Sequence, residues 1–211
     1  TQNQAFSAIV FMYKHLLNQK TTDIGDYIRA KRSQKIPVVL SKDEVQELFK
    51  HLTGVYKLIA GLLYGSGLRI MECMRLRIKD VDFKYKCITV RDGKGKKDRV
   101  TMLPDKITHR LNLQIEKAKI IHHQDLNDGV GTIYLPFAIE GKYKNAGKDW
   151  RWQYVLPAPN LSIDPRTGIK RRHHLSENRM QKEIHKAVIK SGLTKSASCH
   201  TLRHCFATHL L

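Results

Sequence analysis

Four basic side chains in three separate segments have chemistry suited to a phosphodiester. They are Arg69 in Gly67-Leu68-Arg69-Ile70, Lys94 in Gly93-Lys94-Gly95, and the pair in His200-Thr201-Leu202-Arg203. Negative charge accumulates on the non-bridging oxygens of an attacked phosphate, and arginine offers a planar fork that stays charged at any working pH. Lysine can protonate a leaving oxygen, and histidine can exchange a proton near neutral pH. We predict that these four side chains share one phosphate site, with His200 and Arg203 on one face of a helical turn.

The His200 segment also has the spacing of a metal site. Cys199, His200, His204 and Cys205 lie within seven residues, and the two histidines would share a helical face. The glutamate of the zinc-protease pattern His-Glu-x-x-His is absent, because Thr201 occupies its place. Since His200 also has the phosphate assignment, we expect no metal and no other cofactor.

The charge of the chain points to a polyanionic partner. Lysine and arginine number 38 against 19 aspartates and glutamates, which gives a formal net charge of +19 spread along the sequence. Such a chain repels itself strongly unless it meets a polyanion, and nucleic acid is the partner that this excess favours. No long basic amphipathic helix suggests a membrane surface, and no apolar run is long enough to span a bilayer.

The cysteines and the N-terminal segment indicate a cytoplasmic protein. Cys73, Cys87, Cys199 and Cys205 form no Cys-x-x-Cys pair, and we expect reduced, mostly buried thiols. The first residues have no basic segment followed by an apolar one, so no signal peptide is predicted.

Two domains are predicted, with a boundary between residues 35 and 36. Residues 4–17 have helical apolar spacing, and the polar, basic segment 18–37 reads as a linker with cations for phosphates at Arg29, Lys31, Arg32 and Lys35. Residues 1–35 would be the last helix of a helical domain and this linker. Residues 36–211 would form the second domain.

The second domain is predicted to be mainly helical, with a small antiparallel sheet. Ser41 and Glu44 form a capping-box pattern that starts a helix. Further helices are expected at 55–65, after Arg69, at 105–121, after Ser176 up to Gly192, and from Cys199 onward. Segments 85–90 and 99–103 read as strands, and the Asp-Gly between them predicts a hairpin that carries Lys94.

Residues 125–175 interrupt the helical pattern. Glycines and prolines recur through this stretch, which also holds Trp150, Trp152 and the pair His173-His174. A long irregular stretch inside a domain is usually functional or disordered, and its aromatic content argues against disorder. We predict a surface insertion at about residues 125–190.

Taken together, three blocks resemble the catalytic domain of tyrosine recombinases. They are Gly67-Leu68-Arg69-Ile70 with Glu72, Gly93 to Arg99, and His200-Thr201-Leu202-Arg203 followed by His204, Phe206, Ala207 and Thr208. The resemblance covers about residues 36–211 and implies a mainly helical α+β fold. It implies that Arg69 and Arg203 hold the scissile phosphate, Lys94 protonates the 5′-hydroxyl, His200 exchanges protons and Glu72 supports the site. It also implies strand exchange through a 3′-phosphotyrosyl link, without a cofactor, by a homotetramer on DNA.

The middle of the chain resembles the insertion of integron integrases. The resemblance is carried by Leu135-Pro136, Lys142-Tyr143, Trp150 to Val155, Asp164-Pro165-Arg166 and Arg171 to Leu175. In that group the insertion holds bases flipped out of a folded single-stranded site. Trp152, Pro165, His173 and His174 are the candidates for this stacking role. Ordinary core packing is the alternative for the two tryptophans.

The position of the tyrosines departs from the family pattern. The nucleophilic tyrosine of the family lies beyond the second arginine, whereas all eight tyrosines here precede His200. We therefore expect these 211 residues to bind DNA without cleaving it. A non-catalytic DNA-binding protein is the alternative, since the charge alone supports it equally well.

Overall fold

The computed structural model describes residues 2–18, 36–91, 93, 95, 97–135, 139, 142–143 and 145–210. The chain divides into two compact units, Thr1–Ile36 and Pro37–Leu211. The first unit contains the expected N-terminal helix, α1 (Gln2–His15), and none of the residues of α1 is buried. Most of the predicted linker, with its four candidate phosphate-binding cations, lies outside the described residues.

The second unit is mainly helical with small antiparallel sheets, as predicted. Its helices are α2 (Lys42–Lys50), α3 (Gly54–Gly65), α4 (Ile70–Met74), α5 (Asp105–Asn127), α7 (Glu177–Lys190) and α8 (Cys199–Leu210), with short 3₁₀ helices η2 (Ile78–Asp80) and η3 (Trp150–Trp152). One sheet has the order β1-β2-β3, formed by β1 (Val81–Asp82), β2 (Cys87–Val90) and β3 (Arg99–Met102). A second sheet is the hairpin of β4 (Pro157–Ile163) and β5 (Lys170–His174).

Helix α3 is the centre of the hydrophobic core. It contacts α4, α5, α7 and α8, and every residue from Leu58 to Leu63 is buried. A helix that is covered on several sides needs apolar residues all round, which explains why α3 has no polar face. The helices α4 and α8, which begin next to the candidate site residues, thus pack against the most deeply buried helix of the unit.

Local capping signals agree with the structure. Ser41 accepts a hydrogen bond from the Glu44 amide at 3.2 Å, and the Glu44 carboxylate accepts one from the Ser41 amide at 2.7 Å, so the predicted capping box is present. Ser176 is the N-cap of α7, although its side chain makes no capping hydrogen bond. Gly192 follows the end of α7 with a φ of +64°, a conformation that glycine adopts without strain.

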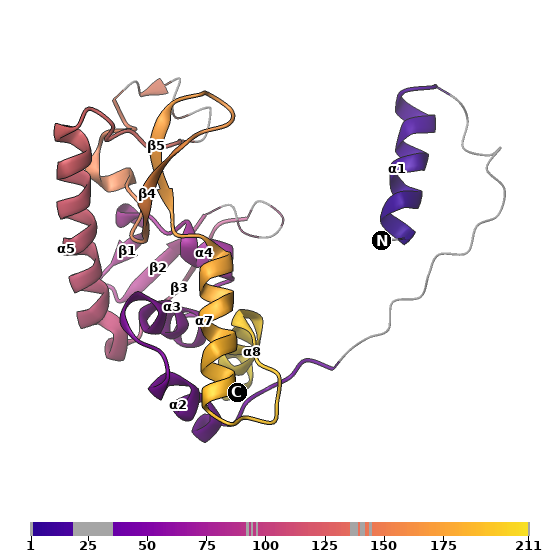
Figure 1. Ribbon diagram of the computed structural model, residues 1–211, viewed down its shortest axis with the longest axis vertical. Helices are drawn as coiled ribbons and strands as arrows, with labels where there is room; N and C mark the ends of the chain where they lie inside the picture. The colour runs from indigo at the N-terminus through magenta and orange to yellow at the C-terminus, as the bar shows by residue number, and fades with distance from the viewer. Residues whose placement is uncertain are drawn as a thin grey trace. The chain divides into compact units, whose positions relative to one another are not determined.

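The predicted irregular insertion contains regular structure. Helix α5 continues to Asn127, beyond the expected end at residue 121, and β4 and β5 form a hairpin with a register shift between Pro157 and Leu161. This hairpin projects from the end of the unit that lies opposite α2 (Figure 1). At the other end of the insertion, α7 buries Met180 and Ile184 in the main core.

The thiols are free, as expected. Cys73, Cys199 and Cys205 are buried and Cys87 is partly buried. Burial raises the pKa of the Cys199 thiol to about 11, which keeps it protonated at neutral pH. No helix in the described part of the chain has the length and apolar character needed to cross a membrane.

Candidate active site

Arg69 is placed by a tight loop between α3 and α4. Gly67 in this loop has a φ of +59°, and a Cβ at this position would collide with the ring of Phe206 on α8. The Gly67 carbonyl accepts a hydrogen bond from the Arg203 guanidinium. Glycine is therefore required here for two reasons, a left-handed backbone and close contact with α8. The loop holds Arg69, the N-cap of α4, next to the first turns of α8.

The structure brings Arg69, His200 and Arg203 to one cavity. Its volume is about 240 Å³, and its lining is completed by Leu68, Ile70, Met71 and Cys199. His200 and Arg203 lie one turn apart in α8, so both face this cavity as the spacing predicted. Two guanidinium groups and an imidazole thus border a space that can admit a phosphate group.

Glu72 lies beside three arginines and binds two of them. Its carboxylate accepts hydrogen bonds from the Arg69 amide at 2.8 Å and the Arg69 guanidinium at 2.7 Å. Arg99, the first residue of β3, donates two more bonds at 2.9 and 2.6 Å in a bidentate pair. The Arg203 guanidinium is 3.9 Å away. The side chain of Glu72 is only 8% exposed, so this carboxylate links α4, β3 and α8.

The charges of the site favour a bound anion. Burial raises the pKa of the Glu72 carboxyl, but hydrogen bonds from Arg99 and Arg69 outweigh this effect and lower the pKa to about 2. Burial and the neighbouring charge of Arg69 lower the pKa of Arg203. Partial burial, His204, Arg203 and Arg69 lower the pKa of His200 below its ordinary value of 6.5. The two guanidinium groups would gain from a negatively charged ligand, and the same ligand would favour the protonated form of His200.

Lys94 itself lies outside the described residues, so its place in the site stays a prediction. The hairpin expected to carry it is present, with Val90 opposite Arg99 at the base. The Gly93 amide donates to the Lys97 carbonyl at 3.2 Å and closes the base of the loop. A Cβ at Gly93 would lie 3.4 Å from the Arg99 guanidinium and 3.7 Å from the Glu72 carboxylate. The loop therefore begins directly beside the Glu72–Arg99 pair.

Trp152 is half-buried in η3, where it packs against the small cluster of Ile133, Leu135, Ala146 and Tyr154. The Lys79 ammonium lies 3.1 Å from the centre of its ring, and the Arg77 guanidinium carbon lies 5.7 Å from the same point. Trp150 packs against the main core and stacks on His122 at 5.8 Å. The packing alternative therefore describes Trp150 well, while Trp152 has cations at its ring.

The remaining insertion candidates lie on or next to the β4–β5 hairpin. His173 stacks on Tyr154 with ring centres 6.3 Å apart, and His174 meets the same tyrosine edge-on at 5.4 Å. Burial lowers the pKa of His174, whose Nδ1 lies 2.9 Å from the Leu175 carbonyl oxygen. Pro165 is exposed in the turn between the two strands. Tyr154 was not predicted, although it lies in the quoted Trp150-to-Val155 segment.

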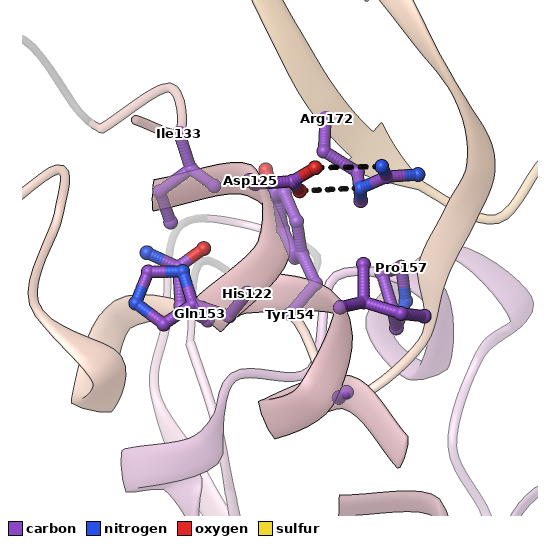
Figure 2. Close-up of a pocket in the computed structure, with 9 residues that line it drawn as sticks. His122, Asp125, Ile133, Gln153, Tyr154, Pro157 and Arg172 are labelled. Atoms are coloured by element: carbon purple, nitrogen blue, oxygen red, sulfur yellow. Dashed lines mark hydrogen bonds and ion pairs between the residues drawn. The ribbon is translucent and has the colours of Figure 1, made fainter. Parts of the chain in front are cut away.

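An ion pair attaches the hairpin to α5. Figure 2 shows Arg172 of β5 facing Asp125 of α5 across two hydrogen bonds of 2.5 and 2.7 Å. Arg172 also donates to the carbonyls of Ala158 and Pro159 on β4. The cavity beside this pair measures only about 10 Å³, so it has no room for a ligand larger than one water. The pair therefore anchors the hairpin to the body of the unit.

The metal-site alternative gains no support from the geometry. The rings of His200 and His204 are 4.4 Å apart and nearly perpendicular, but Cys205 is buried and bonds to Leu40. Within the described residues, no group of three or more histidines, cysteines or carboxylates is placed to hold a metal ion.

Sequence reasoning gave Arg99 no role, although it ends the quoted Gly93–Arg99 block. The available signal was the position of Arg99 at the start of the strand that follows the Lys94 hairpin, which places this arginine close to the predicted site. The bidentate contact with Glu72 depends on the tertiary fold, because the two residues are 27 positions apart in the sequence.

Comparisons with known proteins identify the family. Residues 38–211 match the model of the phage integrase family. An integrase/recombinase of Escherichia coli is 42% identical over 211 residues, covering 100% of this chain and 63% of that protein. Tyrosine recombinase XerA of Pyrococcus horikoshii is 32% identical over 84% of this chain and 49% of its own length. The chain thus spans about 63% of the length of the first curated relatives that it matches.

Solved structures have the same fold. The crystal structure of XerA recombinase matches with a TM-score of 0.51 and 25% identity, covering 99% of this chain and 61% of that one. The Tn1549 transposon integrase, solved in complex with circular intermediate DNA, matches with a TM-score of 0.55 and 18% identity, over 98% and 63% of the two chains. The fold predicted for residues 36–211 is therefore confirmed, and the chain belongs to the phage integrase family of tyrosine recombinases.

Proposed function

We propose that this chain is the phosphate-binding part of a site-specific DNA recombinase. The observation that carries the proposal is the convergence of Arg69, His200 and Arg203 on one cavity, with the buried carboxylate of Glu72 bound to Arg69 and 3.9 Å from Arg203. Arginines separated by more than half the chain meet there, and a +19 chain has the charge to hold DNA. Two XerH structures of similar fold contain difH substrate, which accords with a DNA ligand.

In the proposed reaction, Arg69 and Arg203 bind the non-bridging oxygens and stabilise the charge that develops on them. A tyrosine oxygen forms a bond to phosphorus, and the bond from phosphorus to the 5′-oxygen breaks. His200 takes the tyrosine proton, and Lys94 donates a proton to the 5′-oxygen. The 3′-phosphotyrosyl link keeps the energy of the broken bond for rejoining, so the chemistry needs no metal or nucleotide cofactor.

The 211 residues are proposed to bind DNA without forming this link. No tyrosine in residues 1–211 follows Arg203, whereas the family nucleophile lies beyond that position. Incubation with end-labelled recombination-site DNA, followed by denaturing electrophoresis, tests this proposal. Free DNA alone is expected, and a covalent protein–DNA adduct would contradict it.

A neutral phosphate analogue tests the phosphate site directly. A single methylphosphonate at the scissile position removes the charge that Arg203 is proposed to contact. We expect the substitution to weaken binding by the native chain but to have little further effect on Arg203→Gln, because that variant has already lost the contact. Equal losses in both proteins would place the scissile phosphate elsewhere.

We further propose that the recombinase is an integron integrase. It is supported by the hairpin between α5 and α7, which presents Pro165 and His173, and by the resemblance of the surrounding segments. The substrate would be a folded single strand with extrahelical bases, bound by a homotetramer in the bacterial cytoplasm at the nucleoid. Binding to such a hairpin should exceed binding to the same hairpin with those bases deleted. Equal affinities would favour a recombinase of another type.

Replacing Lys94 distinguishes a recombinase from the alternative, a non-catalytic DNA-binding protein. In the protein that contains the nucleophile, Lys94→Ala should abolish turnover and retain DNA binding. In a simple DNA-binding protein, the same substitution would only reduce the salt dependence of DNA binding, by the amount that corresponds to roughly one phosphate contact.

A further inference from the structure

Lys79 has an unusual position in the second unit. Its ammonium lies 3.1 Å from the centre of the Trp152 ring, well inside the range of a cation–π contact. The backbone fixes this arrangement, because the Ile78 amide donates to the Gln153 carbonyl at 3.0 Å and the Val155 amide donates to the Leu76 carbonyl at 2.9 Å. The lysine and the indole are therefore held together by the pairing of η2 with the segment after η3.

Neighbouring cations surround this lysine, and the nearby carboxylates already have partners. Asp80 binds Arg91 at 2.7 Å, and Asp149 binds Arg151 at 2.7 Å. In the described parts of the chain, no carboxylate forms an ion pair with Lys79. Burial lowers the pKa of the Lys79 ammonium and the positive charge of Arg91 lowers it further, whereas the charge of Asp80 raises it.

Such an ammonium gains free energy when an anion approaches it. An ammonium on a flexible stem suits a phosphate as a point charge. The +19 net charge makes DNA the polyanion that this surface can meet.

We propose that Lys79 binds a backbone phosphate of DNA outside the scissile site, and that Trp152 is the platform that holds its ammonium in place. This inference rests on the proposed DNA binding and adds a second contact to it. It also assigns Trp152 a positioning function for a cation.

Salt-dependent binding measurements on residues 1–211 test the proposal, with duplex DNA that contains no extrahelical base. Loss of one phosphate contact should lower the salt slope by about 0.9. For Lys79→Gln this corresponds to about 8-fold weaker binding at 0.1 M salt. Lys79→Arg keeps the charge and should retain the slope. Lys117→Gln, which removes an exposed lysine from α5, is the matched control and should change the slope less than Lys79→Gln.

A double-mutant cycle tests the platform. Trp152→Leu should weaken binding in the native background but have little effect in Lys79→Gln, because the tryptophan acts through the lysine. Trp152→Phe preserves a ring face and should bind more tightly than Trp152→Leu.

Two results would overturn the inference. One is an unchanged salt slope in Lys79→Gln, and the other is an equal loss from Trp152→Leu in both backgrounds, which would mean that the ring contacts DNA itself. Absence of DNA binding by the native chain would instead refute the proposed function. Thermal unfolding of each variant shows that the compared proteins are folded.

Discussion

Removing the charge of Glu72 should change how the stability of this chain depends on pH. The pKa of this carboxyl is lowered from 4.5 to about 2 in the folded state. A shift of this size corresponds to about 3 kcal/mol of stability at neutral pH. Because the folded pKa is the lower one, this stability is fully present above pH 4.5 and is lost as the pH falls toward 2. Glu72→Gln cannot titrate, so it should lack this contribution at every pH.

Urea unfolding of the native chain and of Glu72→Gln between pH 7 and pH 2 gives the difference in the free energy of unfolding. The variant should be less stable by about 3–5 kcal/mol at pH 7, as expected when one partner of a buried ion pair is removed. The difference should shrink by about 3 kcal/mol as the pH falls from 4.5 to 2. Glu116→Gln, on an exposed position of α5, controls for general loss of negative charge. If the difference in the free energy of unfolding stayed constant across this pH range, Glu72 would not stabilise the fold as an ionised partner of the arginines.

Three further outcomes follow from the structure. Gly67→Ala should lower the free energy of unfolding by about 3 kcal/mol or more, because it adds both backbone strain and a collision with Phe206. Gly168 has a φ of +68° but open space around it, so Gly168→Ala should lower it by only about 1 kcal/mol, and thermal unfolding of both variants gives the comparison. Burial and neighbouring cations lower the pKa of His200, so this pKa should rise when inorganic phosphate binds beside it. An NMR titration in which phosphate leaves the pKa of His200 unchanged would contradict the phosphate site. Asp125→Asn should speed amide hydrogen exchange in β4 and β5 but not in α3, because the ion pair with Arg172 anchors only the hairpin. Equal acceleration in α3 would mean that the pair supports the whole unit.

The sequence predicted the elements whose signals are local. Helical spacing identified α5 and α7, the Ser41–Glu44 pattern identified the start of α2, and the Asp-Gly dipeptide identified the β2–β3 hairpin. The β4–β5 hairpin was missed because Pro157 and Pro159 occur in one strand and the other reads Lys-Arg-Arg-His-His, without apolar alternation. This strand is held by pairing and by its arginine, and neither has a local signature.

The candidate site divides in the same way. Motif spacing predicted that Arg69, His200 and Arg203 would meet, and the cavity places them together. The partners that tune the site are remote in sequence and emerge only in the folded chain. Arg99 reaches Glu72 from another element, and Lys79 reaches Trp152 across more than seventy residues.

The net charge around Glu72 bears on catalysis as well as on stability. Arg69, Arg99 and Arg203 supply three positive charges and Glu72 cancels one, which leaves +2. A phosphodiester bears one negative charge at rest and a second as it is attacked, so a net positive charge greater than one around the phosphate favours the attacked state over the resting state. Glu72→Gln would raise the net charge to +3 and strengthen attraction to the resting phosphate as well. In the protein that contains the nucleophile, this variant should keep or gain DNA affinity while turnover falls. Parallel loss of affinity and turnover in the folded variant would mean that Glu72 acts only by holding the arginines in place.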